Sequence, residues 1–273
     1  MATIKSLFST LLDAYTKNKE LLSVANNAGA HNGIYRGIDL TTKYTEAQIS
    51  AKIQAGDFSD LYIGDYIPKT LTIDGTSVTS NWTIAHFDYW MRIGASDMTQ
   101  HHVILVPSNC LYYKGMNASD TTSGGYKGSR MFTEDMPKVA TALKSAFGSS
   151  HVMSFSNLVS ISVNTSIASM AGGGQTGGVP TWSWAWETRD CDLMTEPMVY
   201  GGTIWSSSSC DIGSGKAQLA LFNLCPTAMN IRSYWWLSGV ASSAYFCYVD
   251  YFGSACAGRA SFARGVRPFF LYH

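Results

Sequence analysis

Four carboxylates lie close together in the sequence and are the first candidates for chemistry. They are Glu187, Asp190, Asp192 and Glu196. Two carboxyl groups held at a set separation act as acid and base in glycoside hydrolysis. No pattern here sets their separation, and solvated loop charges explain them more simply. Hydrolysis of a cell-surface glycan by the carboxylates of Asp190–Glu196 is therefore the alternative hypothesis for function, not the leading one.

Other motifs for catalysis or metal binding are weak. His101 and His102 are adjacent on an expected strand, so their side chains point to opposite faces and are poorly placed to share one ion. The run Gly172-Gly173-Gly174 is not followed by the Lys-Ser/Thr of a phosphate-binding loop. No G-x-S-x-G motif and no C-x-x-C pair occurs among the cysteines, which are Cys110, Cys191, Cys210, Cys225, Cys247 and Cys256. The sequence predicts no catalytic residues, no metal and no cofactor.

Trp182, Trp184 and Trp186 alternate along an extended segment and so share one face of it. Aromatic side chains on a strand usually fill a core. A platform on which carbohydrate rings stack is the sharper alternative for these three indoles.

Charge and hydropathy exclude several partners. The chain has 273 residues with 19 basic and 19 acidic side chains, so it has no electrostatic attraction to nucleic acid or to an anionic bilayer. Its apolar stretches are shorter than the roughly 18 residues of a membrane span. The segment from Leu7 to Tyr15 is interrupted by Ser, Thr and Asp, so no signal peptide is expected. We expect no nucleic-acid partner and no membrane insertion.

The first third of the chain carries helix signals. Apolar residues recur at three-and-four spacing from Ile4 to Tyr15 after a candidate N-cap at Thr3, which predicts an amphipathic helix that packs on the body or on sister subunits. The capping box Thr45-Glu46-Ala47-Gln48 predicts a second helix that ends before Gly56.

From Phe58 onward, strand patterns dominate. Asp74-Gly75 predicts a hairpin turn, and a helix capped by Thr133 is expected to end at Gly148. The expected strands are 61–67, 71–73, 82–87, 102–106 and, from its alternating apolar residues, 159–163. These features predict an α+β fold, with an N-terminal helical segment (1–57) and a larger domain (58–273).

The C-terminal segment 233–273 has an unusual composition. From Ser238 to Arg264 it contains no Lys, Glu, Gln, Met or Trp, although these five types make up about one residue in seven of the chain. A chance gap of this length is expected on the order of one or two times in a hundred. The remaining Tyr, Ser, Gly and Ala are also the residues that antigen-binding loops favour. A buried C-terminal hairpin is the simpler interpretation of the same stretch.

This ending resembles a known group of proteins. The pattern W-W-L-S…Y-V-D…G-S-A…A-S-F-A-R-G-V-R-P-F-F-L is similar to the variable proteins of diversity-generating retroelements. Proteins of that group have a C-type-lectin fold and bind ligands, often at phage tail-fibre tips. Template adenines are mutated in their genes, and the products of an N-N-C codon never include the five missing residue types.

The resemblance implies a division of the tail into frame and ligand-binding residues. Trp235-Trp236-Leu237 and Gly265-Val266-Arg267-Pro268 would form a fixed frame. Glu196-Pro197-Met198 lacks the Asn of the calcium-binding E-P-N triplet, so calcium-dependent sugar binding is not implied. The ligand-binding candidates are Ser242, Ser243, Tyr245, Tyr248, Tyr251, Phe252, Ser254, Cys256, Arg259, Ser261, Phe262 and Arg264.

The leading hypothesis is a non-enzymatic receptor-binding protein of a phage or prophage tail. The resemblance implies a C-type-lectin-like domain, a location in the virion, and a bacterial cell-surface protein or glycan as partner. Tail fibres are usually trimers, so a homotrimer is expected. A structural virion protein without a ligand is the third hypothesis.

Overall fold

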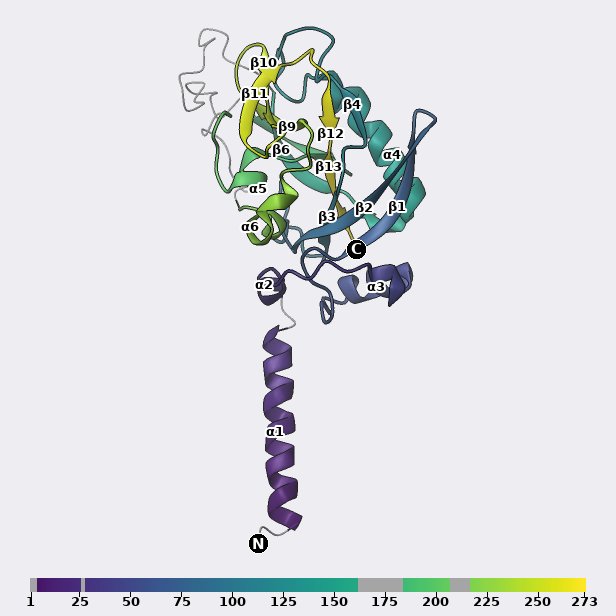
Figure 1. Ribbon diagram of the computed structural model, residues 1–273, viewed down its shortest axis with the longest axis vertical. Coiled ribbons are helices and arrows are strands. Elements are labelled where there is room, and N and C mark those ends of the chain that lie inside the picture. Colours follow the sequence, from purple (N-terminus) through teal and green to yellow (C-terminus); the bar gives the residue numbers. More distant parts are fainter. Residues whose placement is uncertain (1–3, 26–27, 162–183, 207–216) are drawn as a thin grey trace.

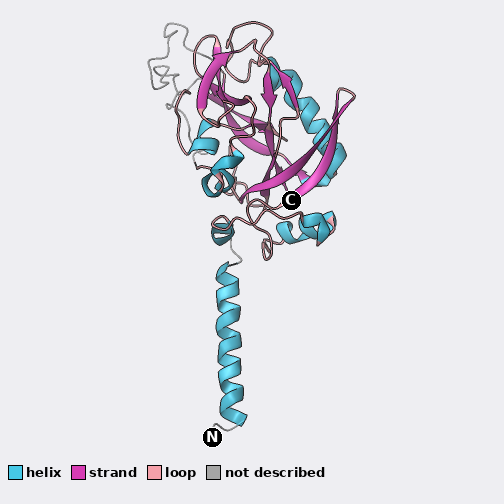
Figure 2. Cartoon of the chain, viewed as in Figure 1, coloured by secondary structure: helices cyan, strands magenta, loops and turns pink. Residues whose placement is uncertain are grey.

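A computed structural model describes residues 4–25, 28–161, 184–206 and 217–273, and its fold is α+β, as the sequence predicts (Figures 1 and 2). The helices are α1 (Ile4–Ala25), α2 (Ala28–His31), α3 (Glu46–Gln54), α4 (Met136–Phe147), α5 (Glu196–Tyr200) and α6 (Ala220–Leu224). The strands are β1 (Tyr66–Ile73), β2 (Thr76–Phe87), β3 (Val103–Pro107), β4 (Tyr112–Lys114), β5 (Val152–Met153), β6 (Phe155–Ser160), β7 (Trp184–Arg189), β8 (Asp192–Leu193), β9 (Trp235–Val240), β10 (Tyr245–Val249), β11 (Ala255–Arg259), β12 (Arg264–Val266) and β13 (Pro268–Tyr272).

The strands form two curled sheets and a separate pair, β6 with β7. The first sheet has the order β1-β2-β3-β13-β5, and β8 also pairs with β13. Every residue of β3 and β13 is buried, so the C-terminal strand lies in the centre of this sheet. Pro268 begins β13, which is a position where a residue without an N–H is tolerated.

The second sheet has the order β11-β10-β9-β12-β4 and is built almost entirely from the C-terminal segment. In Figure 1 it lies at the end of the body opposite to α1. Strand β12 belongs to the second sheet and β13 to the first, and only Arg267 separates them. The chain therefore joins the two sheets at the G-V-R-P motif.

Local signals in the sequence explain several element boundaries. Asp74 and Gly75 have φ values of 49° and 78°, which are the positive values that a two-residue hairpin turn requires between β1 and β2. Thr45 and Gln48 form the predicted reciprocal capping box of α3, and Gly56, with φ of 67°, follows its C-cap. Gly148 ends α4, again with positive φ.

Two boundary predictions are wrong. Thr133 does not cap α4, because it lies inside a π-helical turn (Met131–Asp135) that precedes this helix. Its hydroxyl donates to the carbonyl of Ser129. The expected strand at 61–67 begins only at Tyr66. The preceding residues follow an irregular path around the buried carboxylate of Asp65, which accepts hydrogen bonds from Arg36 and from the Tyr62 amide.

A single hydrophobic core extends from the N-terminal third to the last strand. Ile49 and Ile53 of α3 are fully buried in the same cluster as Trp82 of β2 and Phe270 of β13. The segment from α3 onward therefore packs against the body, and the core continues across Asp57, where the sequence suggested a domain boundary.

Helix α1 differs from this body. It is longer than the predicted Ile4–Tyr15 helix and extends away from the rest of the molecule (Figure 1). Its apolar side chains from Ile4 to Tyr15 are exposed, so the expected packing on the body is not present. Thr3, the predicted N-cap, lies outside the described residues. No helix among the described residues is long and apolar enough to span a membrane.

Candidate functional site

The structure places the twelve ligand-binding candidates on the second sheet and its loops. Tyr245, Phe252, Ser254, Arg259 and Phe262 are exposed, and Ser243, Tyr248, Tyr251, Cys256, Ser261 and Arg264 are half-buried. Ser242 differs from the prediction, because it is buried and its carbonyl accepts a hydrogen bond of 2.7 Å from the Thr122 hydroxyl. Eleven of the twelve candidates are thus accessible at least in part, while Ser242 holds the β9–β10 turn onto the Thr122 loop.

The residues expected to form the frame are all buried. Trp235, Trp236 and Leu237 have no exposed surface. Gly265 pairs with Trp235 and with Tyr113 on the two neighbouring strands. A Cβ atom at Gly265 would lie 2.1 Å from the Cys110 sulfur, so this position of the G-V-R-P motif accepts only glycine.

The loops between these strands are held by short-range hydrogen bonds. The Asp250 carboxylate accepts from the amides of Phe252 and Ser254, each at 2.8 Å, and so fixes the β10–β11 turn. Asp120 accepts from the amide and hydroxyl of Ser261, which lowers the pKa of its carboxyl group, and it pairs with Arg259 at 3.2 Å. The loops are therefore preorganised before any ligand arrives.

A continuous group of rings and guanidinium groups lies on the second sheet and its loops; we call it the aromatic face. Tyr248 of β10 makes ring contacts with Trp236 and Tyr234, with centroids 6.0 Å apart in both cases. Tyr234 continues to Tyr251, and Tyr251 to Phe252. Its members are Arg232, Tyr234, Tyr248, Tyr251, Phe252, Phe262 and Arg264, and they pack against the fully buried ring of Trp236.

Arg264 lies at the centre of the aromatic face. Its guanidinium carbon is 3.8 Å from the ring centroid of Tyr248 and 4.6 Å from that of Trp236. This stacking requires Gly258 on β11, because a Cβ atom there would come within 2.4 Å of a guanidinium nitrogen. These two rings hold the guanidinium in place, and its Nε and Nη1 atoms are buried without a hydrogen-bond partner in the described chain.

The charge on the aromatic face is not balanced. Within the described residues, no ion pair joins Arg232 or Arg264 to a carboxylate, whereas Arg259 is paired with Asp120. The Asp250 carboxylate is engaged by backbone amides of its own turn. The face therefore combines aromatic surface with two cations that have no acidic partner in the described chain.

Three exposed residues on or beside the aromatic face, Arg232, Tyr234 and Tyr113, were not among the candidates that the sequence indicated. Tyr234 precedes the W-W-L motif and is 48% exposed. Tyr113 of β4 is 61% exposed, and its hydroxyl lies 2.7 Å from that of Ser233. Tyr113 is far from the tail in sequence, and the pairing of β4 with β12 brings it there. No local signal indicated this pairing.

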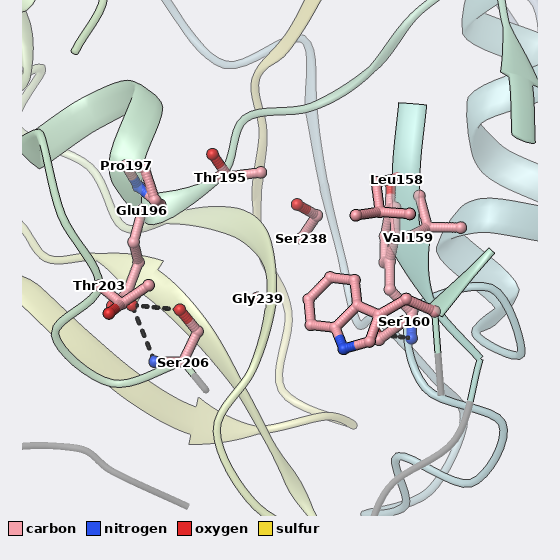
Figure 3. A pocket seen from close by; sticks show the side chains of 12 residues that line it. Leu158, Val159, Ser160, Thr195, Glu196, Pro197, Thr203, Ser206, Ser238 and Gly239 are labelled. Atoms are coloured by element: carbon pink, nitrogen blue, oxygen red, sulfur yellow. Dashed lines mark hydrogen bonds between the residues drawn. The ribbon is translucent and has the colours of Figure 1, made fainter. Parts of the chain in front are cut away.

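Glu196 of the alternative hypothesis is fully buried and binds a loop (Figure 3). Its carboxylate accepts hydrogen bonds from the amides of Ile204, Trp205 and Ser206, at 2.8 to 3.1 Å, and from the Ser206 hydroxyl. The adjoining cavity is about 30 Å³, which is room for about one water molecule. Small-molecule sites usually measure roughly 300–1,000 Å³. Within the described chain, the Glu196 carboxylate is therefore occupied by hydrogen bonds to the 204–206 loop, and the cavity beside it is too small for a sugar.

The other three carboxylates also have partners of their own. Asp190 pairs with Lys144 at 2.6 Å, and Glu187 pairs with Lys127. Buried Asp192 accepts hydrogen bonds from the Tyr126 hydroxyl and from the Asn157 amide. The structure thus assigns each of the four to a separate interaction and not to a common cleft.

Replacing Glu196 with glutamine is expected to lower the free energy of unfolding by about 2 kcal/mol. In the wild type, several backbone N–H groups donate to the two oxygens of the Glu196 carboxylate. Glutamine has only one oxygen, and its NH2 group is itself a donor, so at least one buried N–H loses its acceptor. Urea unfolding monitored by circular dichroism measures the change. Glu187→Gln, at a partly exposed carboxylate, is the control and should change stability by less than about 0.5 kcal/mol. Equal losses in the two variants would contradict this role of Glu196.

The two adjacent histidines have different environments. His101 pairs with Asp88 at 2.8 Å, whereas buried His102 accepts from the Trp90 amide and donates to the Gln100 carbonyl. No group of three or more His, Cys, Asp or Glu side chains suited to a metal ion occurs in the described residues. Five of the six cysteines are described, and all five are free thiols.

The tryptophan stripe is only partly described. Trp182 lies outside the described residues. Trp184 and Trp186 are on β7, opposite Ser160 and Leu158 of β6. Trp184 is half-buried and lines the small cavity beside Glu196, whereas Trp186 is 36% exposed. Neither of these two indoles is fully buried, so they do not fill the core in the way that aromatic residues on a strand usually do.

Comparisons with known proteins return no relative. No protein-family model matches the chain, no curated protein matches it, and no solved structure matches it.

Proposed function

We propose that this chain is a non-enzymatic ligand-binding protein and that the aromatic face is its binding surface. The observation that supports this most is the division of the tail. Within the stretch that lacks five residue types, eleven of the twelve candidates are accessible at least in part, whereas Trp235–Leu237 and Gly265–Pro268, which flank this stretch, are buried. Such a surface tolerates substitution because its frame is separate from it.

The chemistry of the aromatic face suits recognition. Aromatic side chains and arginine carry most of the binding energy at protein interfaces, and tyrosine gives a large contact area for few immobilised torsions. Phe252 and Phe262 are 71% and 53% exposed. Because Arg232 and Arg264 have no acidic partner in the described chain, the ligand in this proposal presents at least one acidic group to the face.

We further propose the setting that the resemblance implies. The protein would be the receptor-binding protein of a phage or prophage tail, with a C-type-lectin-like domain and a bacterial cell-surface protein or glycan as its ligand. The missing residue types support this proposal because template-adenine mutation produces the same restriction. Sequencing the DNA downstream of the gene tests it. A near-identical repeat that differs only at adenines, next to a reverse transcriptase gene, is expected, and an invariant tail among sister isolates would contradict it.

Truncating the exposed rings is expected to remove binding without unfolding the protein. In the double variant Phe252→Ala/Phe262→Ala, affinity for the ligand should fall about 100-fold, because each exposed ring loses its contact area. The free energy of unfolding should change by less than about 1 kcal/mol, since neither side chain is in the core. The measurement is binding of fluorescently labelled protein to a panel of intact bacterial cells, together with urea unfolding.

Ile34→Ala provides the matched control for that experiment. Ile34 is 49% exposed but lies outside the aromatic face, so its removal should leave binding unchanged. A large loss of stability in the double variant would show that the rings belong to the core. Undiminished binding would show that the ligand contacts another surface.

A further inference from the structure

A cavity of about 180 Å³ lies between the tip of the β1–β2 hairpin, β4 and the start of α4. Figure 1 shows these three elements on one side of the body. The side chains of Ile73, Val78 and Leu111 supply its apolar walls, and Thr76 of the hairpin, which is exposed, also lines it. Protein interiors are close-packed, and voids larger than a water molecule are few. This space is therefore a candidate for a ligand.

A cluster of polar side chains at this cavity has unsatisfied atoms. Tyr112 and Asp135 line the cavity, and Arg130 lies beside Asp135. Among the described residues, the Tyr112 hydroxyl, Oδ2 of Asp135 and Nε of Arg130 are buried and have no hydrogen-bond partner. The side chain of Asp135 is 2% exposed, and Lys114 donates to its other oxygen at 2.8 Å. Buried polar groups without partners are costly, so this cluster needs a further polar group.

The unsatisfied atoms specify what that group is. Oδ2 of Asp135 requires a donor. The Tyr112 hydroxyl is itself a donor, because burial and then the negative charge of Asp135 raise the pKa of Tyr112 well above its ordinary value of 10. A hydroxyl group both donates and accepts, so one hydroxyl can serve both residues. Lys114 and Arg130 already place two cations near Asp135, so the added group needs no positive charge.

The volume of the cavity favours a ring-sized molecule over a single water. A water molecule requires about 10–15 Å³, whereas this cavity measures about 180 Å³. An engineered apolar cavity of about 150 Å³ in another protein binds benzene. The apolar walls formed by Ile73, Val78 and Leu111 offer a ring the same kind of surface.

We propose that this cavity binds a small uncharged ring compound that carries one hydroxyl group, as phenol does. The hydroxyl donates to Asp135 and accepts from Tyr112, and the ring packs on the apolar walls. Both polar atoms are covered in the structure, so the Tyr112 side chain shifts when the ligand enters, a kind of adjustment that is common on binding. The site is separate from the aromatic face and goes beyond the proposed function.

NMR titration of the full chain, labelled at the methyl groups of Ile, Leu and Val, tests the proposal with phenol and toluene as probes. The two probes have the same number of non-hydrogen atoms and differ in the hydroxyl. Phenol at millimolar concentrations should shift the resonances of Ile73, Val78 and Leu111 but not that of Ile34, which does not line the cavity. Phenol should bind about 10-fold more tightly than toluene, because only phenol can donate to the Asp135 carboxylate. Absence of shifts with both probes would overturn the site, and equal affinity would overturn the role of its polar atoms.

Val78→Phe fills the cavity and should abolish the phenol-induced shifts of Ile73 and Leu111. Ser77→Phe is the matched control, because Ser77 is exposed and the next side chain along a strand points to its opposite face, so binding should be unchanged. Persistent shifts in a folded Val78→Phe protein would show that phenol binds elsewhere.

Tyr112→Phe keeps the test decisive if Val78→Phe does not fold. The variant lacks the hydroxyl donor, so its affinity for phenol should fall about 5-fold while that for toluene stays the same. Its stability in urea should not decrease, because the hydroxyl that it loses is buried without a partner in the described chain. An unchanged affinity for phenol would contradict the proposed hydrogen bond from Tyr112.

Discussion

Replacing Arg267 with alanine is expected to lower the free energy of unfolding by about 3 kcal/mol. Arg267 is only 2% exposed, and it lies between the two sheets at the junction of β12 and β13. Its guanidinium donates to the carbonyls of Pro107 and Ala228, at 2.9 and 3.0 Å. It also stacks on Trp235, 4.8 Å from the ring centroid.

Alanine would leave both carbonyls without a donor and would open a cavity beside Trp235. The gain from removing a buried charge offsets part of this loss, because burial lowers the pKa of Arg267 to about 10 and so disfavours the charged form in the folded state. The free energy lost with the two hydrogen bonds and the packing on Trp235 is larger than the free energy gained by removing the buried charge. Arg267→Met keeps most of the volume and drops the charge, so it should lose less stability than Arg267→Ala.

Urea unfolding of the purified variants measures both effects, and Arg259→Ala is the control. Arg259 belongs to the same segment, but its side chain is 56% exposed and pairs with Asp120 at the surface. Its replacement should therefore change the free energy of unfolding much less than that of Arg267. If Arg267→Ala were as mild as Arg259→Ala, Arg267 would not be the link between the two sheets.

Acidification from pH 7 to pH 4 is expected to destabilise the protein by about 3 kcal/mol through His86 alone. Burial lowers the pKa of His86 from 6.5 to about 4, and the nearby His102 adds to this effect. The neutral ring of His86 accepts a hydrogen bond of 3.0 Å from the Ala220 amide at the start of α6. Protonation would remove that acceptor.

The direction follows from proton binding by the two states. Below pH 6.5 the unfolded chain binds a proton at this residue, whereas the folded chain does not bind it until about pH 4. The contribution of His86 to the free energy of unfolding is therefore fully present above pH 6.5 and is lost as the pH falls toward 4. Buried His102, whose pKa is also lowered by burial, acts in the same direction.

Unfolding free energies at pH 7, 6, 5 and 4 check this prediction when wild type is compared with His86→Asn. Asparagine can accept from the Ala220 amide but does not titrate, so the decline with falling pH should become shallower. Other groups contribute equally to both proteins and cancel in the comparison. An identical decline in wild type and variant would show that His86 titrates normally in the folded state.

Much of the local structure could be predicted from short-range signals. The Thr45 capping box, the Asp74-Gly75 turn and the glycine stop after α4 all have the expected geometry. Each of these features depends on residues within a few positions of one another, so a short stretch of sequence is enough to predict it. The onset of α4 was misplaced because the turn before it is a π-helical one, which no cap residue marks.

Sheet order and strand register could not be predicted in this way. The central position of β13 between β3 and β5, and the pairing of β4 with β12, join segments more than a hundred residues apart. The β9–β10 pair also has a register shift between Phe246 and Tyr248, which leaves extra residues on β9 and which no local signal marks. Composition indicated which segment is unusual, but tertiary contacts decide which side chains it exposes.

If the aromatic face binds a ligand, as we propose, the stacking of Arg264 affects how its specificity would change. Tyr248, Trp236 and Phe262 all contact the same guanidinium, so replacing one ring moves the cation that the others hold. Effects of residues that share a partner do not add. Improvement by one substitution at a time would therefore often stall, whereas changing several positions in a single event would reach combinations that no sequence of single steps favours.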